Sequence, residues 1–168
     1  PQRCRRGQHP PALLRCEGPT LAEHVAEPCQ TLAGHGRQHA LHYEIHVGSW
    51  AGLSTAQMHE LHPDFERAIR EGRDHRRSPE GETATETGER VCAALREIAQ
   101  AHPGQTVVIA SHGLAIRMGV GALLGWDYLT SWWLGPLGNC HWAVVQEWGV
   151  GTPLQRWRLQ GWNVSAHG

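Results

Sequence analysis

A continuous apolar run at residues 106–110, followed at once by a Ser-His-Gly turn at residues 111–113, constrains the fold more than any other feature. The run is mainly β-branched, which favours a strand buried on both faces, as in a parallel sheet. Apolar residues at helical spacing predict one helix over residues 83–101 and another over residues 114–124. This order of helix, strand, tight turn and helix is typical of an α/β sheet.

A helical stretch with a break or kink near His62, followed by a loop, is predicted after residue 54. Ser54 and Gln57 have the spacing of a capping box, and helical periodicity follows them. Pro63 predicts a break in that periodicity, because a proline inside a helix removes a backbone hydrogen bond. Residues 72–81 are charged and contain a proline, which indicates a loop.

The C-terminal sequence predicts secondary structure more clearly than the N-terminal sequence does. Residues 141–148 and 154–159 are typical of two strands, which a glycine-rich turn could join as a hairpin. Residues 21–32 have a weak helical pattern, and the rest of residues 1–40 gives no clear prediction.

Composition excludes several classes of protein. A length of 168 residues suggests one domain over residues 1–168, and a net charge of −1 gives no bulk attraction to nucleic acid. The apolar runs are shorter than the roughly 18–20 residues that a membrane span needs. Five scattered cysteines without a CxxC pair, and no visible leader, favour a cytoplasmic protein with reduced thiols. Eight tryptophans make surface association, and so a homodimer, plausible.

His112 is the first candidate site residue. It lies where the predicted strand ends and the next helix begins, and ligands of open α/β sheets bind at such strand ends. The helix N-terminus favours an anion such as phosphate, and Gly113 would let the backbone approach that anion closely. The alternative is that His112 only caps or packs at a turn.

Glu44 and Arg3 are the second and third candidates. Glu44 lies between Tyr43 and Ile45, which could partly desolvate its carboxyl group and suit it to general-acid work. Arg3 could make bidentate contacts to phosphate. The simpler interpretations are a solvated surface glutamate and a solvated basic terminus, in which Arg5 and Arg6 compete for the role of Arg3.

Several segments, in order, resemble the histidine phosphatase (phosphoglycerate mutase-like) superfamily over roughly residues 41–163. The strand ending in Ser-His-Gly at 111–113 is similar to that family's second histidine motif. Residues 44–53 resemble its segment of a glutamate followed by G-x-W-x-G, and Gly-Glu-Thr at 81–83 resembles its Gly-Glu-Ser turn. The C-terminal residues 137–140 and 157–159 are similar to its closing strands.

The resemblance implies an α/β three-layer sandwich with a mostly parallel central sheet. It also implies a phosphomonoesterase or a phosphoglycerate mutase-like enzyme that acts on small phosphomonoesters through a phosphohistidine, without a metal or another cofactor. By this resemblance His112 is the second pocket histidine and Glu44 the proton donor, while Gly113 and Arg3 contact the phosphate.

The chain departs from the family in one important respect, because no Arg-His-Gly motif occurs in it to supply the nucleophile. Arg5-Arg6-Gly7 has an arginine where the histidine should be. We interpret this as a fold incomplete at its N-terminus, with a degenerate pseudoenzyme as the alternative, and residues 1–40 as atypical of the family. Either interpretation predicts very weak or absent turnover.

Two other functions stay open. A non-catalytic phosphate- or phosphoester-binding module would keep part of the anion pocket without the chemistry. A histidine-based metal protein would use the cluster formed by His39, His42 and His46. Apart from a possible second copy of the chain, the sequence indicates a small phosphorylated substrate as the partner, and neither nucleic acid nor a membrane.

Overall fold

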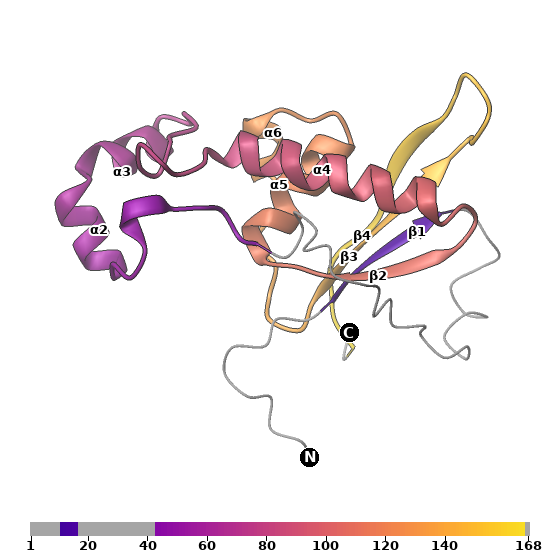
Figure 1. Ribbon diagram of the computed structural model, residues 1–168, viewed down its shortest axis with the longest axis horizontal. Coiled ribbons are helices and arrows are strands. Elements are labelled where there is room, and N and C mark those ends of the chain that lie inside the picture. Colours follow the sequence, from indigo (N-terminus) through magenta and orange to yellow (C-terminus); the bar gives the residue numbers. More distant parts are fainter. Residues whose placement is uncertain (1–10, 17–42, 167–168) are drawn as a thin grey trace, which may run out of the picture.

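The computed structural model describes residues 43–166 and the backbone of residues 11–16. Its sheet has four strands in the order β2-β1-β3-β4 (Figure 1). The strands are β1 (Pro11–Cys16), β2 (Thr106–Ala110), β3 (Trp142–Trp148) and β4 (Arg156–Val164). The chain is thus a mixed α/β protein, as the sequence predicts.

The pairing of the strands corrects the prediction of a mostly parallel sheet. Only β1 and β3 pair in parallel, whereas β1 with β2 and β3 with β4 are antiparallel in the described part of the chain. The β3–β4 pair is the predicted hairpin, and strands joined by so short a turn must be antiparallel. β2 is the edge strand of this sheet, so only its Val107 is fully buried and the prediction of burial on both faces is wrong.

The helices confirm most of the local predictions. Ser54 and Gln57 form the predicted capping box, and the helical pattern breaks at residue 62 so that Pro63 opens a new helix. Thr83 and Glu86 form a second capping box at the start of the long helix. The helices are α2 (Thr55–Leu61), α3 (Pro63–Arg70), α4 (Ala84–Ala101), α5 (Gly113–Leu123) and α6 (Tyr128–Trp132), with a short 3-10 turn at Gly48–Trp50.

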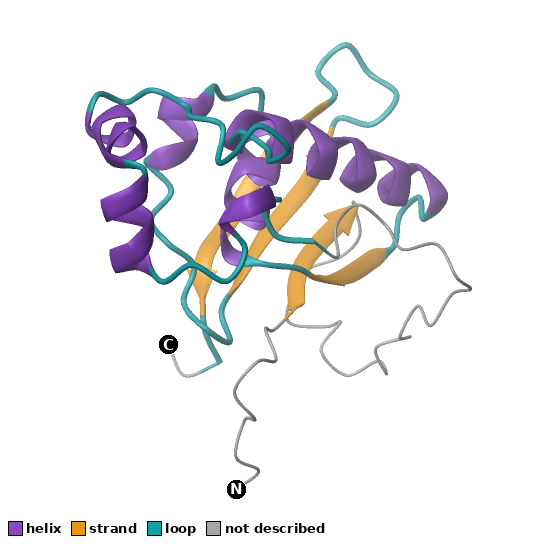
Figure 2. Cartoon of the chain, turned by 60° about the vertical axis from the view of Figure 1, so that its left-hand side comes forward, coloured by secondary structure: helices purple, strands orange, loops and turns teal. Residues whose placement is uncertain are grey.

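The described helices α4 and α5 cover one face of the sheet (Figure 2). Their apolar side chains meet Ala143 and Val145 of β3 in a single core, with Ile109 of β2 and Leu159 of β4 at its margin. The described residues therefore form two layers, and the third layer of the predicted sandwich is not among them. No helix in the described ranges combines the length and apolarity that a membrane crossing requires.

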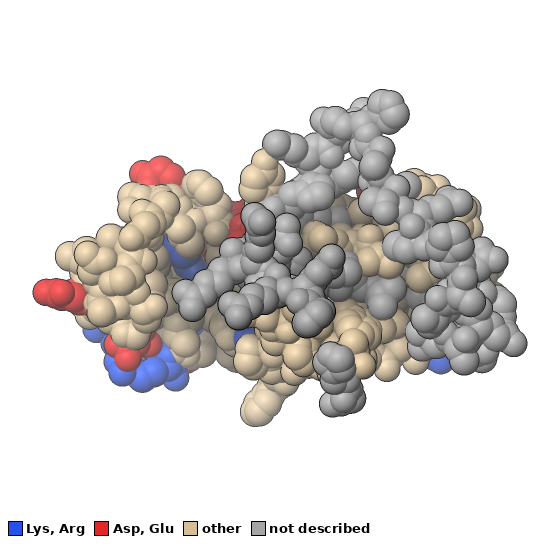
Figure 3. Space-filling model, turned by 90° about the horizontal axis from the view of Figure 1, so that it is seen from below, with Lys and Arg blue, Asp and Glu red and all other residues tan. Residues whose placement is uncertain are grey.

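Helices α2 and α3 form a lobe beyond the end of the sheet (Figures 1 and 2). Trp50 is buried in this lobe, where its ring stacks on His62 at 4.3 Å and meets Phe65 edge-on at 5.3 Å. Acidic and basic side chains lie close together on the outside of the lobe, at the left of Figure 3. Short-range ion pairs on α3 explain this mixture, because Arg67 binds Asp64 at 2.7 Å.

Residues 43–47, which connect to this lobe, are held by Glu82 rather than by a neighbouring strand. The Glu82 N–H donates to the His46 carbonyl at 2.7 Å, and the Glu82 carboxylate accepts the His46 N–H at 2.9 Å. Arg90 of α4 donates to the same carboxylate at 2.8 and 2.9 Å. Burial raises the pKa of Glu82, but the hydrogen bonds from Arg90 and His46 outweigh it and hold the pKa below its ordinary value.

The contact between α4 and α5 depends on two glycines, which gives a first prediction. A Cβ added at Gly119 would lie 2.1 Å from Cγ1 of Val91, and one added at Gly88 would lie 2.8 Å from the Met118 carbonyl oxygen. We predict that Gly119→Ala lowers the free energy of unfolding by about 1–3 kcal/mol, since the β-branched Val91 cannot easily move aside. Urea unfolding measures this change.

Gly135→Ala is the matched control, because no described atom beyond the adjacent residues lies within 4 Å of a Cβ added there. Its free energy of unfolding should change by no more than about 0.5 kcal/mol. A Gly119→Ala protein as stable as the wild type would show that the two helices are not in close contact.

The lowered pKa of Glu82 gives a second prediction. A carboxyl group whose pKa is lower in the folded state stabilises the fold above its unfolded pKa of about 4.3, and this contribution is lost as the pH falls through the folded pKa. We therefore expect Glu82→Gln to reduce the free energy of unfolding at neutral pH. The variant should also lose less stability than the wild type on acidification below about pH 4.3.

Urea unfolding at neutral pH and at about pH 3 tests this sign. Glu60→Gln is the control, since Glu60 is exposed on α2 and its carboxylate has no hydrogen-bond partner among the described residues. Parallel pH curves for wild type and Glu82→Gln would contradict the stabilising role of this carboxylate.

Candidate phosphate-binding site

His112 lies at the junction that the sequence predicts, directly after β2 and before α5. It is the N-cap residue of α5 with an extended backbone (φ −113°, ψ 160°), and its carbonyl accepts the Ile116 N–H at 2.8 Å. Its side chain is half-buried, so the imidazole remains accessible. His112 therefore lies just beyond the C-terminal end of β2, at the N-terminus of α5.

Open space adjoins this junction at Gly113. Among the described residues, and apart from its chain neighbours and the nearby helix backbone, no atom lies within 4 Å of the position that a Cβ at Gly113 would occupy. The described residues leave the Gly113 backbone open on this side, and the approach of an anion there stays a prediction of the sequence. Substitution by a larger residue would fill the space beside His112.

Glu44 is brought to the same place from a distant part of the chain. Its Oε1 accepts the Ala115 N–H at 2.9 Å, and its Oε2 accepts the Leu114 N–H at 3.2 Å. The first turn of a helix has no intrahelical acceptor for these N–H groups, and its positive end attracts a carboxylate. Glu44 is half-buried, in agreement with partial desolvation, and also accepts the Ile45 N–H at 3.0 Å.

This contact changes one expectation about the anion site. The sequence predicts that the helix N-terminus would bind phosphate, but Glu44 already occupies two of its N–H groups, those of Leu114 and Ala115. The space that remains for an anion lies at Gly113, beside His112. The predicted acid and the predicted anion site are therefore neighbours on one helix turn.

Arg77 is a buried cation near this site that sequence reasoning did not single out. Its side chain is only 7% exposed, Nη1 donates to the His75 carbonyl at 2.5 Å, and the same nitrogen lies 3.6 Å from Asp74. Burial lowers the pKa of Arg77, and attraction to Asp74 and Glu44 among other groups opposes that shift. Its position in a charged loop gave no indication of burial.

Other sequence-based candidates lie elsewhere. Arg3 is outside the described residues, and so are His39 and His42 of the possible metal cluster. His46 is described, and its Nδ1 lies 3.0 Å from the Glu80 carbonyl oxygen. Within the described ranges, no three His, Cys, Asp or Glu side chains are placed to hold a metal ion.

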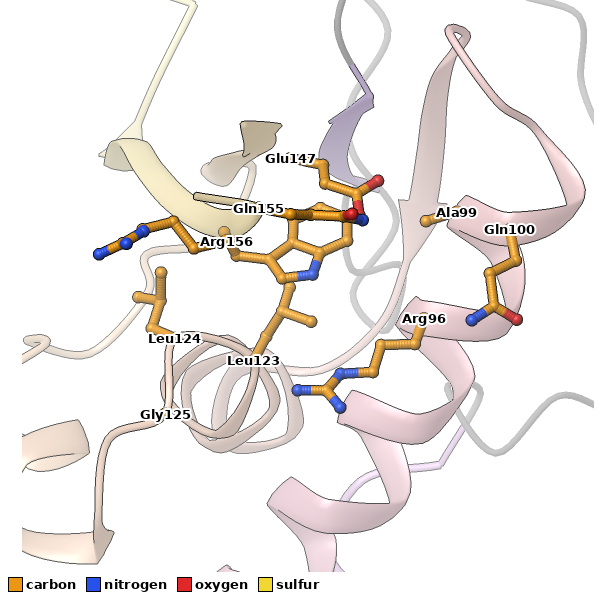
Figure 4. Close-up of a pocket in the computed structure, with 10 residues that line it drawn as sticks. Arg96, Ala99, Gln100, Leu123, Leu124, Gly125, Glu147, Gln155 and Arg156 are labelled. Carbon is orange, nitrogen blue, oxygen red and sulfur yellow. The ribbon is translucent and has the colours of Figure 1, made fainter. Parts of the chain in front are cut away.

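One cavity on the described surface adjoins the site. It has a volume of about 480 Å³ and is lined by Glu44, Glu82 and Arg90 among other residues. Another cavity, of about 550 Å³, lies between α4, the end of α5 and the β3–β4 hairpin (Figure 4). Arg96 points into it beside Leu123, but neither His112 nor Glu44 lines it.

Comparison with known proteins finds phosphatases among the relatives of this chain. A sequence profile of the histidine phosphatase superfamily (branch 1) matches residues 22–163. The glucosyl-3-phosphoglycerate phosphatase of Mycobacterium tuberculosis is 31% identical over 135 residues, which cover 73% of this chain and 60% of that protein. Phosphoserine phosphatase 1 of Hydrogenobacter thermophilus is 34% identical over 104 residues, or 61% of this chain and 48% of that protein.

A solved structure shares the fold as well. The mycobacterial glucosyl-3-phosphoglycerate phosphatase in complex with inorganic phosphate matches with a TM-score of 0.63 at 30% sequence identity, over 77% of this chain and 64% of that one. The chain spans less than two thirds of the length of the curated relatives it matches. By its sequence match over residues 22–163 and its structural likeness, the chain belongs to the histidine phosphatase superfamily (branch 1).

Proposed function

We propose that this chain carries the phosphoryl-binding and proton-donating part of a histidine phosphatase-type site. The observation that carries the proposal is the contact of the Glu44 carboxylate with the first turn of α5, immediately after His112. In the same helix turn, the position of a Cβ at Gly113 is open among the described residues. The reaction class is the transfer of a phosphoryl group from a small phosphomonoester through a phosphohistidine.

The residues fit the physical needs of that step. Phosphoryl transfer depends mainly on positioning and on stabilising negative charge around the equatorial oxygens. A phosphoryl group at Gly113 would receive hydrogen bonds from His112 and from the backbone, with Arg3 as a further phosphate ligand. No step of this scheme needs a cofactor.

Glu44 would act as acid and then as base. A histidine nitrogen attacks phosphorus, the bond to the ester oxygen breaks, and the departing alkoxide takes a proton from Glu44. A water molecule then gives its proton to Glu44 and attacks the phosphohistidine, which releases inorganic phosphate. Oε2 of Glu44 accepts only the Leu114 N–H among the described hydrogen bonds, so a second lone pair is left to carry the proton.

The nucleophile is the part of the scheme that this sequence does not supply. No Arg-His-Gly motif occurs in the chain. We therefore propose that turnover by this chain is very weak or absent, although the phosphoryl-binding side of the site is retained. This same combination favours a second candidate function, a phosphate- or phosphoester-binding module without catalysis.

The names of the relatives suggest the kind of substrate. Glucosyl-3-phosphoglycerate and phosphoserine both carry a phosphomonoester on a three-carbon acid unit, which in the first compound also bears a glucosyl group. We propose a small, acidic phosphomonoester for this chain. A cytoplasmic location and a homodimer stay predictions of the sequence.

A pair of measurements on wild type and His112→Ala gives the third prediction. We expect little or no hydrolysis of para-nitrophenyl phosphate by the wild-type chain, because no nucleophile is identified. Titration calorimetry with inorganic phosphate should still detect binding, and His112→Ala should weaken it about tenfold or more, as the loss of a charge-assisted hydrogen bond does.

His59→Ala is the matched control, since His59 is an exposed histidine on α2, away from α5. It should bind phosphate like the wild type. Equal phosphate binding by wild type and His112→Ala would eliminate the proposed site. Strong phosphomonoesterase activity that His112→Ala abolishes would overturn the proposal of weak turnover and require a nucleophile among the other histidines.

A further inference from the structure

We propose that Glu82 and Arg90 are positioning residues of this site, and that their ion pair holds the carboxylate of Glu44 against the N-terminus of α5. The inference rests on the proposed function only in naming the site, because the contacts themselves are independent of catalysis. Neither residue reaches the space at Gly113 in the described contacts. Each acts through the backbone of the segment that carries Glu44.

The ion pair is partly buried and doubly hydrogen-bonded. Nε and Nη2 of Arg90 donate to the two carboxylate oxygens of Glu82 at 2.8 and 2.9 Å. The two side chains are 23% and 22% exposed. Parallel bonds of this kind fix the orientation of both groups, which a single lysine contact would not do.

The pair is linked to the backbone on both sides of Glu44. On the C-terminal side, Glu82 exchanges hydrogen bonds with the N–H and the carbonyl of His46. On the N-terminal side, Arg90 lies 3.5 Å from the carbonyl oxygens of Tyr43 and of Glu44 itself. Glu44 is therefore held between two anchored neighbours.

Apolar packing cannot replace these links. Residues 43–47 belong to no helix or strand, and the cavity of about 480 Å³ opens beside them. Backbone groups without a ladder partner need side-chain partners, and Glu82 and Arg90 supply them here. Arg90 also belongs to α4, which packs against α5, so the pair ties the acid to the same core that positions His112.

Amide hydrogen exchange at the start of α5 tests this role without any assay of activity. The N–H groups of Leu114 and Ala115 have no intrahelical acceptor, so their protection reports the contact with Glu44. Glu44→Ala defines the exchange rates when that contact is lost. We expect Arg90→Ala to speed exchange at both amides about three- to tenfold, toward the Glu44→Ala rates, as loss of one hydrogen bond predicts.

Hydrogen exchange at amides inside the helices distinguishes a loss of positioning at Glu44 from a general loss of stability. Exchange at Val91 and Val120, both in the core, should change much less than exchange at Leu114 and Ala115. Arg90→Lys should restore part of the protection. Arg70→Ala removes an exposed ion pair with Glu66 and should leave all four amides unchanged.

Unchanged protection of Leu114 and Ala115 in Arg90→Ala would overturn the inference, as would an equal acceleration at all four amides. Either result leaves the proposed function to be judged by phosphate binding alone. Conversely, selective loss of protection in a chain that binds no phosphate would support the positioning role while removing the proposed function. The two proposals can therefore fail separately.

Discussion

The described site depends on one electrostatic contact, in which the Glu44 carboxylate accepts two N–H groups of the first turn of α5, those of Leu114 and Ala115. A helix N-terminus carries partial positive charge and donors without acceptors, so it must bind an anion or water. Here a side chain supplies the anion, and the helix holds a carboxylate beside His112. The contact thereby places an acid next to the space at Gly113 where a phosphoryl group could lie.

Packing of α4 against α5 and the Glu82–Arg90 ion pair position the two partners of that contact. α4 and α5 approach closely through Gly88 and Gly119, and their shared core with β3 fixes the position of α5 against the sheet. α4 in turn carries Arg90, which with Glu82 fixes the segment of Glu44. The packed helices α4 and α5 thus position both partners of the contact.

Local features of the sequence predicted the helices and the strand that carry the site. The strand order of the sheet and the Glu82–Arg90 ion pair depend on contacts between residues that no local pattern connects. The apolar stripe of α4, the capping box at Ser54 and the strand before His112 depend on neighbouring residues, so they could be predicted. The strand β1 and the antiparallel order of the sheet depend on pairing partners far along the chain. Glu82 and Arg90 lie eight residues apart across a helix start, where no regular spacing indicates an ion pair.

The most direct test of this account is a titration of the ¹⁵N-labelled chain with inorganic phosphate, followed by nuclear magnetic resonance. The account predicts saturable shifts at the Gly113 amide and the His112 ring, with smaller shifts at Leu114 and Ala115, whose N–H groups Glu44 already binds. Amides of the α2–α3 lobe should not respond. A folded chain in which phosphate leaves Gly113 and His112 unchanged would contradict the account.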